Sequence, residues 1–219
     1  MKKVFSPLAE EGRRLLLLEL GWSLALLAIV SFALPALLPI VVLIFLSAAA
    51  FTLFFFREPR FVPLAPESGL ILSPSYGTVL KTGLENGRPV IRIFLSVLDV
   101  HSQYSPVAGT VRRIVVFGEK FFPAFRKEAS LNRRNLIEIS LAGSESLVVE
   151  QIAGSIARRI SCPLKAGDSL RPGYRLGLIY FGSQVAVYLP AGAEILVQPG
   201  TRVYPCRTIL AKLSLNGGR

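Results

Sequence analysis

The sequence is short of the residues on which many protein functions depend. Only two of its 219 residues are cysteine, Cys162 and Cys206, and His101 is the single histidine. Two cysteines are too few for a disulfide scaffold or a four-cysteine zinc site, and one histidine excludes a histidine-rich metal centre. No glycine-rich phosphate loop follows a strand and opens a helix, as a nucleotide site requires. We therefore expect neither a metal nor a nucleotide cofactor.

Charged residues are missing altogether between Leu20 and Phe56. A helix crosses a membrane core of roughly 30 Å in about 20 residues, so this run is almost twice too long for one straight helix. Pro35 and Pro39 lie at its middle, and proline breaks a helix interior. The sequence predicts a membrane-associated helical hairpin, with helices over 15–34 and 40–56. Whether the hairpin spans the bilayer or dips into its interface stays open.

Positive charge dominates wherever charge is present. The chain carries 25 Lys+Arg against 14 Asp+Glu, a net charge of +11, although 52% of its residues are hydrophobic. Cations precede and follow the uncharged run, and positive flanks stay in the cytoplasm. We therefore expect the cell membrane as the location, with the rest of the chain on its cytoplasmic side. A domain tethered there meets anionic phospholipid, so the basic surface favours a lipid partner over nucleic acid.

The remainder of the chain, residues 61–219, is typical of a β-rich domain. Short apolar segments bounded by Gly, Pro or Asn predict strands at 90–95, 109–116, 136–141, 147–152, 176–181 and 184–189. Glycine-containing turns before strands, at 105–111, 162–168 and 189–194, resemble those of barrel-sandwich domains. The predicted fold is mostly β (α+β): a hairpin over 1–60, then a β-rich, barrel-sandwich-like domain over 61–219.

Six short motifs follow one another along the chain. They are Phe55–Pro59, Ser73–Gly77, Phe94–His101, Asn132–Asn135, Gln151–Ile160 and Phe181–Ser183. In this order they resemble the phosphatidylserine decarboxylase family, in its short bacterial and archaeal form. The resemblance covers nearly the whole chain. Gln151–Ile160 is its most specific stretch, whereas a Gly-Ser pair alone is common in turns.

The resemblance implies a self-cleaving proenzyme. Ser183 attacks the carbonyl of Gly182, and the chain divides into a large chain (1–182) and a small chain (183–219). Ser183 becomes a pyruvoyl group, which forms a Schiff base with the amine of phosphatidylserine. Loss of carbon dioxide then yields phosphatidylethanolamine, a step of phospholipid biosynthesis. His101 serves as the general base.

The substrate and the partners follow from the same resemblance. The basic residues Arg134, Arg158 and Arg159 are candidates for holding the substrate's phosphate and carboxylate. The two chains of one precursor stay partners, and a homodimer is left open. A related lipid with a serine headgroup, of the archaetidylserine type, is an alternative substrate. A membrane-anchored module that never matures is the non-enzymatic alternative.

One departure from the family pattern concerns the partner of His101. Tyr76 stands where the family has an aspartate, and a tyrosine carries no negative charge at pH 7. Asp99 lies two residues before His101 and would share its face on a strand, so it is the alternative partner. Maturation happens once per molecule, so a slow cleavage is tolerable.

Overall fold

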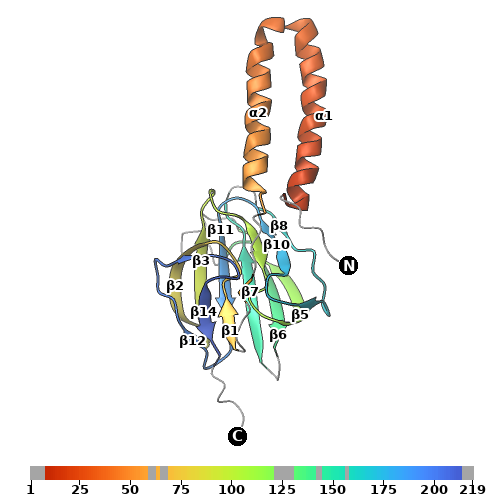
Figure 1. The fold of residues 1–219 in the computed structure, drawn as a ribbon. Helices are drawn as coiled ribbons and strands as arrows, with labels where there is room; N and C mark the ends of the chain where they lie inside the picture. The colour runs from red at the N-terminus through yellow and green to blue at the C-terminus, as the bar shows by residue number, and fades with distance from the viewer. Residues whose placement is uncertain are drawn as a thin grey trace. The chain divides into compact units, whose positions relative to one another are not determined.

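The chain folds into two compact units, Met1–Arg60 and Phe61–Arg219. The computed structural model describes residues 8–58, 63–64, 69–120, 131–141, 145–155 and 158–213 (Figure 1). The first unit is helical and the second is built of strands. This confirms the predicted fold class of a helical hairpin followed by a β-rich domain.

The first unit is a hairpin of two apolar helices, α1 (Glu10–Ala33) and α2 (Leu38–Phe55), joined by the short 3-10 helix η1 (Pro35–Leu37). Both helices are long and apolar enough to cross a membrane, and little of either is buried within the protein. The side chains of Thr52 and Glu19 join them through a 2.7 Å hydrogen bond. These helices associate the chain with a membrane.

The predicted boundaries of both helices were wrong by a few residues. Helix α1 begins at Glu10 rather than near residue 15, because two glutamates in its first turn favour the positive end of the helix dipole. Helix α2 begins before Pro39, because proline is tolerated in a first turn, where its missing N–H has no helical partner. The helix break instead falls at Leu34, since a residue preceding proline is pushed away from helical geometry.

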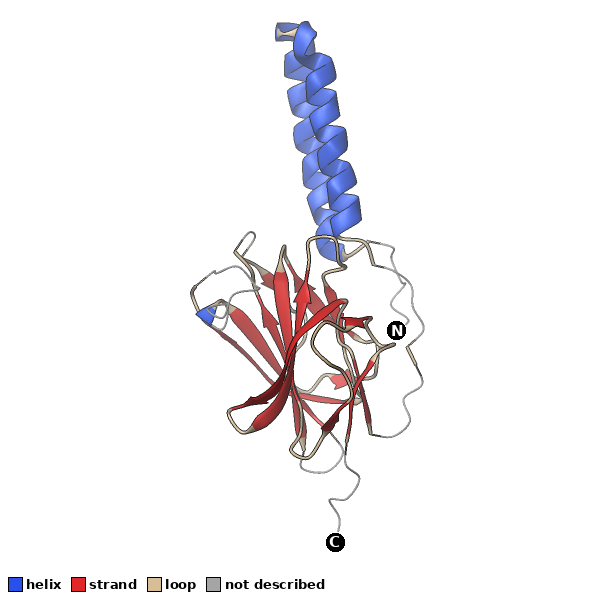
Figure 2. Ribbon diagram, turned by 90° about the vertical axis from the view of Figure 1, so that its left-hand side faces the viewer, coloured by secondary structure: helices blue, strands red, loops and turns tan. Residues whose placement is uncertain are grey.

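The second unit is organised around one large antiparallel sheet that curls into a half-barrel (Figure 2). Its strand order is β13-β2-β3-β11-β7-β6-β5-β9. The strands are β2 (Gly77–Glu85), β3 (Arg88–Leu95), β5 (Gly109–Phe117), β6 (Arg134–Ser140), β7 (Ser146–Ile152), β9 (Ser169–Leu170), β11 (Ser183–Tyr188) and β13 (Arg202–Val203). Every strand pairing in this sheet is antiparallel.

Two small antiparallel sheets complete the unit. One has the order β1-β14-β12 and the other β4-β10-β8. Their strands are β1 (Leu70–Leu72), β4 (Ser102–Tyr104), β8 (Ile160–Ser161), β10 (Arg175–Ile179), β12 (Glu194–Ile195) and β14 (Ile209–Lys212). The sheet β4-β10-β8 matters for function, because β4 follows His101 directly and β10 leads towards Ser183.

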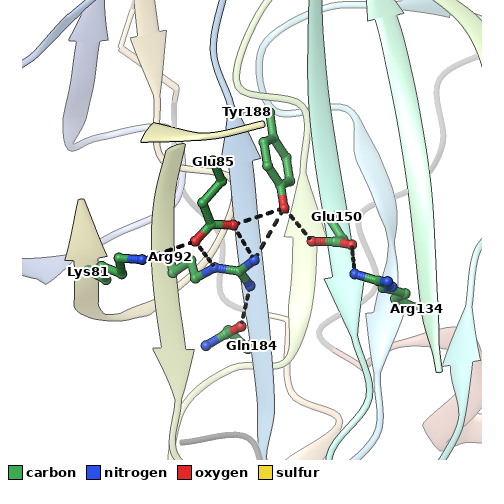
Figure 3. A network of polar contacts seen from close by, with 7 residues as sticks. All are labelled: Lys81, Glu85, Arg92, Arg134, Glu150, Gln184 and Tyr188. Atoms are coloured by element: carbon green, nitrogen blue, oxygen red, sulfur yellow. Dashed lines mark hydrogen bonds and ion pairs between the residues drawn. The ribbon is translucent and has the colours of Figure 1, made fainter. Parts of the chain in front are cut away.

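The central strands of the large sheet have two unlike faces, because successive side chains of a strand point to opposite sides. On the core face, Ile91, Ile93, Val185 and Val187 belong to the main apolar cluster. The opposite face, here called the polar face, carries a network of charged and polar groups (Figure 3). Its members are Lys81, Glu85, Arg92, Arg134, Glu150, Gln184 and Tyr188.

Candidate active site

The register of the large sheet gathers the sequence motifs at one end of the strands. Ser183 opens β11 opposite Leu95, the last residue of β3. The next residue, Gln184, lies opposite Ile152, where β7 ends. Strand β2 begins at this end too, at Gly77. We call this end, defined by Gly77, Leu95, Ile152 and Ser183, the site end.

Ser183 is fully buried on the core face. Its hydroxyl oxygen has no hydrogen-bond partner within the described part of the chain. The two preceding residues both have left-handed backbone angles, with φ of 47° at Phe181 and 57° at Gly182. Such an angle is strained for phenylalanine and accessible to glycine. A buried, unused hydroxyl thus directly follows a strained turn.

Gly154 lies directly against the peptide bond that precedes Ser183. A Cβ atom added to Gly154 would overlap the carbonyl oxygen of Gly182 and lie only 2.8 Å from its carbonyl carbon. It would also lie 3.0 Å from the carbonyl oxygen of Phe181. Only glycine leaves room for the backbone of the 181–182 turn at this position. The sequence analysis did not single out Gly154, although it belongs to the most specific motif.

His101 is fully buried and lies beside the segment that leads to Ser183. Its main-chain carbonyl accepts a 3.2 Å hydrogen bond from the N–H of Ile179, four residues before Ser183. The ring atom Nδ1 is 2.8 Å from the main-chain carbonyl oxygen of Asp99. A carbonyl only accepts, so this contact favours the tautomer that carries its proton on Nδ1 and leaves Nε2 as the basic nitrogen.

The carboxylate of Asp99 is turned towards Arg202 rather than towards the ring of His101. Arg202 donates hydrogen bonds to both of its oxygens, and the N–H of Ser96 donates another at 2.9 Å. Although burial raises the pKa of Asp99, the bonds from Arg202 and Ser96 outweigh it, and the net pKa is lowered. Asp99 therefore orients His101 through its main-chain carbonyl, while its ionised side chain anchors the loop.

Three buried amide side chains connect β4 to the large sheet. Gln103 donates to the carbonyl of His101 at 2.5 Å and accepts from Gln151 at 2.7 Å. Gln151 in turn accepts from Asn135 at 2.8 Å. All three side chains are almost fully buried, and a buried amide network of this kind is rigid when its groups are paired. The sequence analysis missed this network, because its members are more than ten residues apart.

Tyr76 lies in the bend that leads into β2. Its ring stacks edge-on against Tyr204, with ring centres 5.9 Å apart. The same bend is tied to β4, because the carbonyl of Pro74 accepts a 2.8 Å hydrogen bond from the N–H of Tyr104. Tyr76 is therefore held near the site end, although its ring is used in packing against another tyrosine.

The three arginines predicted to bind substrate have different surroundings. Arg159 is exposed, and its carbonyl accepts a 3.0 Å hydrogen bond from the N–H of Tyr180. Arg158 is exposed beside it, with a φ of 55°. Arg134 belongs to the polar face, where its guanidinium pairs with Glu150 at 3.2 Å. The first two lie next to the strained turn, whereas Arg134 points away from the core face.

The described residues contain no group of three His, Cys, Asp or Glu side chains placed to hold a metal ion. Cys162 and Cys206 are both free thiols. Burial raises the pKa of Cys206 to about 12, so it is not a reactive thiolate near neutral pH.

The fold and this site define a class: a membrane-associated, mostly β protein with a buried serine that follows a glycine in a strained turn. Comparison with known proteins identifies the family. The family model described as phosphatidylserine decarboxylase matches residues 48–211. The chain therefore belongs to the phosphatidylserine decarboxylase family, as its motifs predicted.

Curated relatives from several bacteria carry the name phosphatidylserine decarboxylase proenzyme. The one from Rhodococcus erythropolis is 43% identical over 180 residues, which cover 77% of this chain and 75% of the relative. The one from Gluconobacter oxydans is 42% identical over 179 residues, covering 77% and 79%. The one from Solidesulfovibrio magneticus is 41% identical over 182 residues, covering 80% and 84%.

Proposed function

We propose that this chain is a phosphatidylserine decarboxylase proenzyme that cleaves itself between Gly182 and Ser183. The observation that carries this proposal is the buried, unpartnered hydroxyl of Ser183 directly after the turn of Phe181 and Gly182, whose backbone is strained at Phe181. The family relatives are named as proenzymes, which implies processing into chains. In this proposal Ser183 is the nucleophile, the carbonyl of Gly182 is its target, and His101, on a segment bonded to Ile179, is the base.

Cleavage begins with an N-to-O acyl shift at the turn. The Oγ of Ser183 forms a bond to the carbonyl carbon of Gly182, the amide C–N bond breaks, and the hydroxyl proton ends on the released nitrogen. Gly182 has no side chain to obstruct this attack, and the strain at Phe181 is relieved when the neighbouring peptide bond opens. Gly154 acts as a positioning residue, because it lets the carbonyl of Gly182 lie against the β7 segment.

His101 is the proposed base for the second step. Loss of the Cα proton of Ser183 expels the carboxylate of Gly182 and leaves dehydroalanine, which water converts to a pyruvoyl group with release of ammonia. The contact of Nδ1 with the Asp99 carbonyl leaves Nε2 to take that proton. The main-chain contacts of Asp99 and Gln103 hold His101 in place, with no need for a carboxylate at position 76.

A pyruvoyl group at residue 183 supplies an electrophilic carbonyl and an electron sink for decarboxylation of an amine-bearing lipid. The residues present fit such a group, because position 183 is buried on the core face, where its side-chain oxygen has no other partner among the described residues. Arg158 and Arg159, exposed beside the turn, are the proposed partners of the substrate's phosphate and carboxylate. The substrate proposed from the family is phosphatidylserine, and the product is phosphatidylethanolamine.

The two chains produced by cleavage stay together. Strand β11 begins at the new N-terminus and lies between β3 and β7, both of which belong to the large chain. Arg202 of the small chain also holds Asp99 of the large chain. We further propose that both ends of the apolar hairpin lie in the cytoplasm, because cations flank it on both sides.

Replacement of the nucleophile tests this function directly. We expect Ser183→Ala to remain a full-length chain and to lack decarboxylase activity, because alanine has no oxygen for the acyl shift. The unmodified chain should separate into fragments 1–182 and 183–219, the smaller one with a ketone-reactive N-terminus. Intact-mass analysis after reaction with a hydrazide measures both properties.

The control is Ser75→Ala, which removes another buried hydroxyl near the site end. This variant should still cleave. An unmodified chain that stays intact after prolonged incubation in membranes would contradict the proposal.

A further inference from the structure

The lipid chemistry proposed above constrains which part of the β unit meets the membrane. The acyl chains of a diacyl lipid stay in the bilayer, and each headgroup layer is only about 5–8 Å thick. The reacting amine therefore stays within the headgroup layer or just outside it. Position 183 is buried at the site end of the large sheet. The site end must then come down onto the bilayer surface.

An exposed apolar turn lies at that end. Strand β3 ends at Leu95, and the chain then turns through Val97 and Leu98 before it reaches Asp99. Val97 is 41% exposed and Leu98 is 71% exposed. The turn is held in shape at its base, because Asp99 bonds to Ser96 and to Arg202. A rigid turn that presents two apolar side chains to solvent has no evident use in water.

A third exposed apolar side chain belongs to the segment that holds the base of this turn. Tyr204 is 48% exposed and comes two residues after Arg202, the residue that holds Asp99. A tyrosine with an apolar ring and a polar tip suits the boundary between headgroups and acyl chains.

Exposed cations belong to segments at the same end of the sheet. The exposed arginines Arg158 and Arg159 neighbour the strained turn, and Arg207 lies in the turn that follows Tyr204. Exposed apolar side chains next to basic residues are the composition of a surface that sits on anionic lipid. The net charge of +11 has the sign that such a surface requires.

We propose that the turn Val97–Leu98, together with Tyr204, inserts into the headgroup–acyl boundary of an anionic bilayer and seats the site end on the membrane. The partner is the phospholipid surface itself. This inference rests on the proposed function, because a lipid substrate is what brings the site end to the bilayer. The turn helps substrate held in the membrane to reach position 183, and it takes no part in self-cleavage.

The chain offers a matched control for the turn. Leu84 is 72% exposed, almost the same as Leu98, and it lies opposite Pro89 at the other end of β3. The two positions are separated along the sheet by about 20 Å. A charge introduced at position 84 or at position 98 is therefore almost equally exposed, but it lies at opposite ends of the sheet.

The first experiment compares Leu98→Asp with Leu84→Asp in full-length protein reconstituted into vesicles that contain phosphatidylserine. We expect Leu98→Asp to lower turnover of vesicle phosphatidylserine about tenfold or more, because a charge replaces a leucine that would otherwise insert into the bilayer. Self-cleavage, and turnover of a short-chain phosphatidylserine dissolved as monomers, should stay within about twofold of the unmodified protein. Leu84→Asp should leave all three properties unchanged.

The outcomes separate this inference from the proposed function. Equal losses on the vesicle and short-chain substrates would overturn it, because the turn would then serve the site itself. Unchanged vesicle turnover, or a change of oligomeric state caused by Leu98→Asp, would also overturn it, the latter in favour of a contact with a second copy. If the unmodified protein cleaves neither itself nor either lipid, the proposed function fails first.

The second experiment measures insertion of position 98 into the bilayer and does not depend on enzyme activity. Trp22 is the single tryptophan of the chain, so a Trp22→Phe background gives a clean fluorescence signal. In that background Leu98→Trp should shift to shorter wavelength in anionic vesicles and be quenched by lipids brominated on their acyl chains. Leu84→Trp should show neither effect. A Leu98→Trp signal that bromolipids do not quench would refute the insertion.

Discussion

The two faces of strand β11 differ in whether their hydroxyl groups have hydrogen-bond partners. On the polar face, Tyr188 accepts from Arg92 and lies within hydrogen-bond distance of Glu85 and Glu150 (Figure 3). Arg92 forms a two-pronged pair with Glu85, at 2.9 and 2.6 Å. On the core face, the hydroxyl of Ser183, five residues before Tyr188, has no partner among the described residues.

We infer from this difference that the polar face stabilises the fold, whereas the site end carries out the chemistry. The bonds from Arg92 lower the pKa of Glu85 to about 2, so its carboxylate is ionised and fully used. Burial raises the pKa of Glu150, and Arg134 only partly offsets this effect. A buried hydroxyl without a partner destabilises a fold, and at Ser183 the proposed acyl shift gives that hydroxyl a use. We therefore expect changes on the polar face to alter stability, and changes at the site end to alter self-cleavage.

Among the variants that test this contrast, Gly154→Ala should have the largest effect, which is on the rate of self-cleavage. The added methyl group displaces the carbonyl of Gly182, and a shift of about 1 Å in a reacting group costs on the order of a hundredfold in rate. We expect self-cleavage to slow by at least this factor, measured by intact mass over time. Hydroxylamine, which cleaves esters, should release no large chain, because the acyl shift itself is blocked.

Gly109→Ala is the matched control for Gly154→Ala. Its added methyl group also meets a backbone carbonyl, that of Ser140, away from the site end. This variant should lose stability and cleave at the normal rate. If both variants cleave normally, Gly154 does not position the carbonyl.

The next largest effect should come from Arg92→Leu on the polar face. The change leaves Glu85 without its main partner, and breaking a largely buried pair costs about 2–4 kcal/mol of unfolding free energy. For a domain of this size the melting temperature should fall by about 6–12 °C. Self-cleavage at a temperature where the variant is folded should stay within twofold.

Arg112→Leu provides the comparison for Arg92→Leu. Arg112 also pairs with a glutamate, Glu138, but its side chain is 64% exposed. Exposed pairs contribute little, so its melting temperature should change by only about 1–3 °C. A folded Arg92→Leu variant that fails to cleave would show that the two faces are not independent.

The sequence predicted strands well where one face is uniformly apolar. All six predicted strands are present, each within two residues of its predicted bounds. Strand β2 was missed, because Lys81, Thr82 and Gly83 interrupt the alternation of apolar and polar residues. The Asn86-Gly87 pair between β2 and β3 is a hairpin signal that could have found it.

Only those residues of the site that lie within the sequence motifs could be predicted. Motif order pointed to Ser183 and His101, which the fold brings to neighbouring segments. The partner of the Asp99 carboxylate lies 103 residues away in the sequence, so no local pattern reveals Arg202. Arg134 illustrates the same limit, since a step of one residue along a strand exchanges the core face for the polar face.

A smaller effect than that of Arg92→Leu is expected for the pH dependence of stability on the polar face. The pKa of Glu85 falls from 4.5 in the unfolded chain to about 2 in the folded protein, mainly through its hydrogen bond from Arg92. A lowered pKa means that the stabilisation is fully present above about pH 4.5 and disappears as the pH falls through 2. Glu85→Gln should therefore melt about 3 °C below the unmodified protein at pH 7.

That gap should narrow steadily between pH 4.5 and pH 2, because protonation removes the same charge that the substitution removes. Thermal melts followed by circular dichroism at several pH values measure it, with self-cleavage blocked in both proteins by Ser183→Ala. A gap that stays constant down to pH 2 would mean that the pair with Arg92 does not stabilise the sheet through its charge. The polar face would then owe its stability to packing, and the contrast with the site end would rest on Ser183 alone.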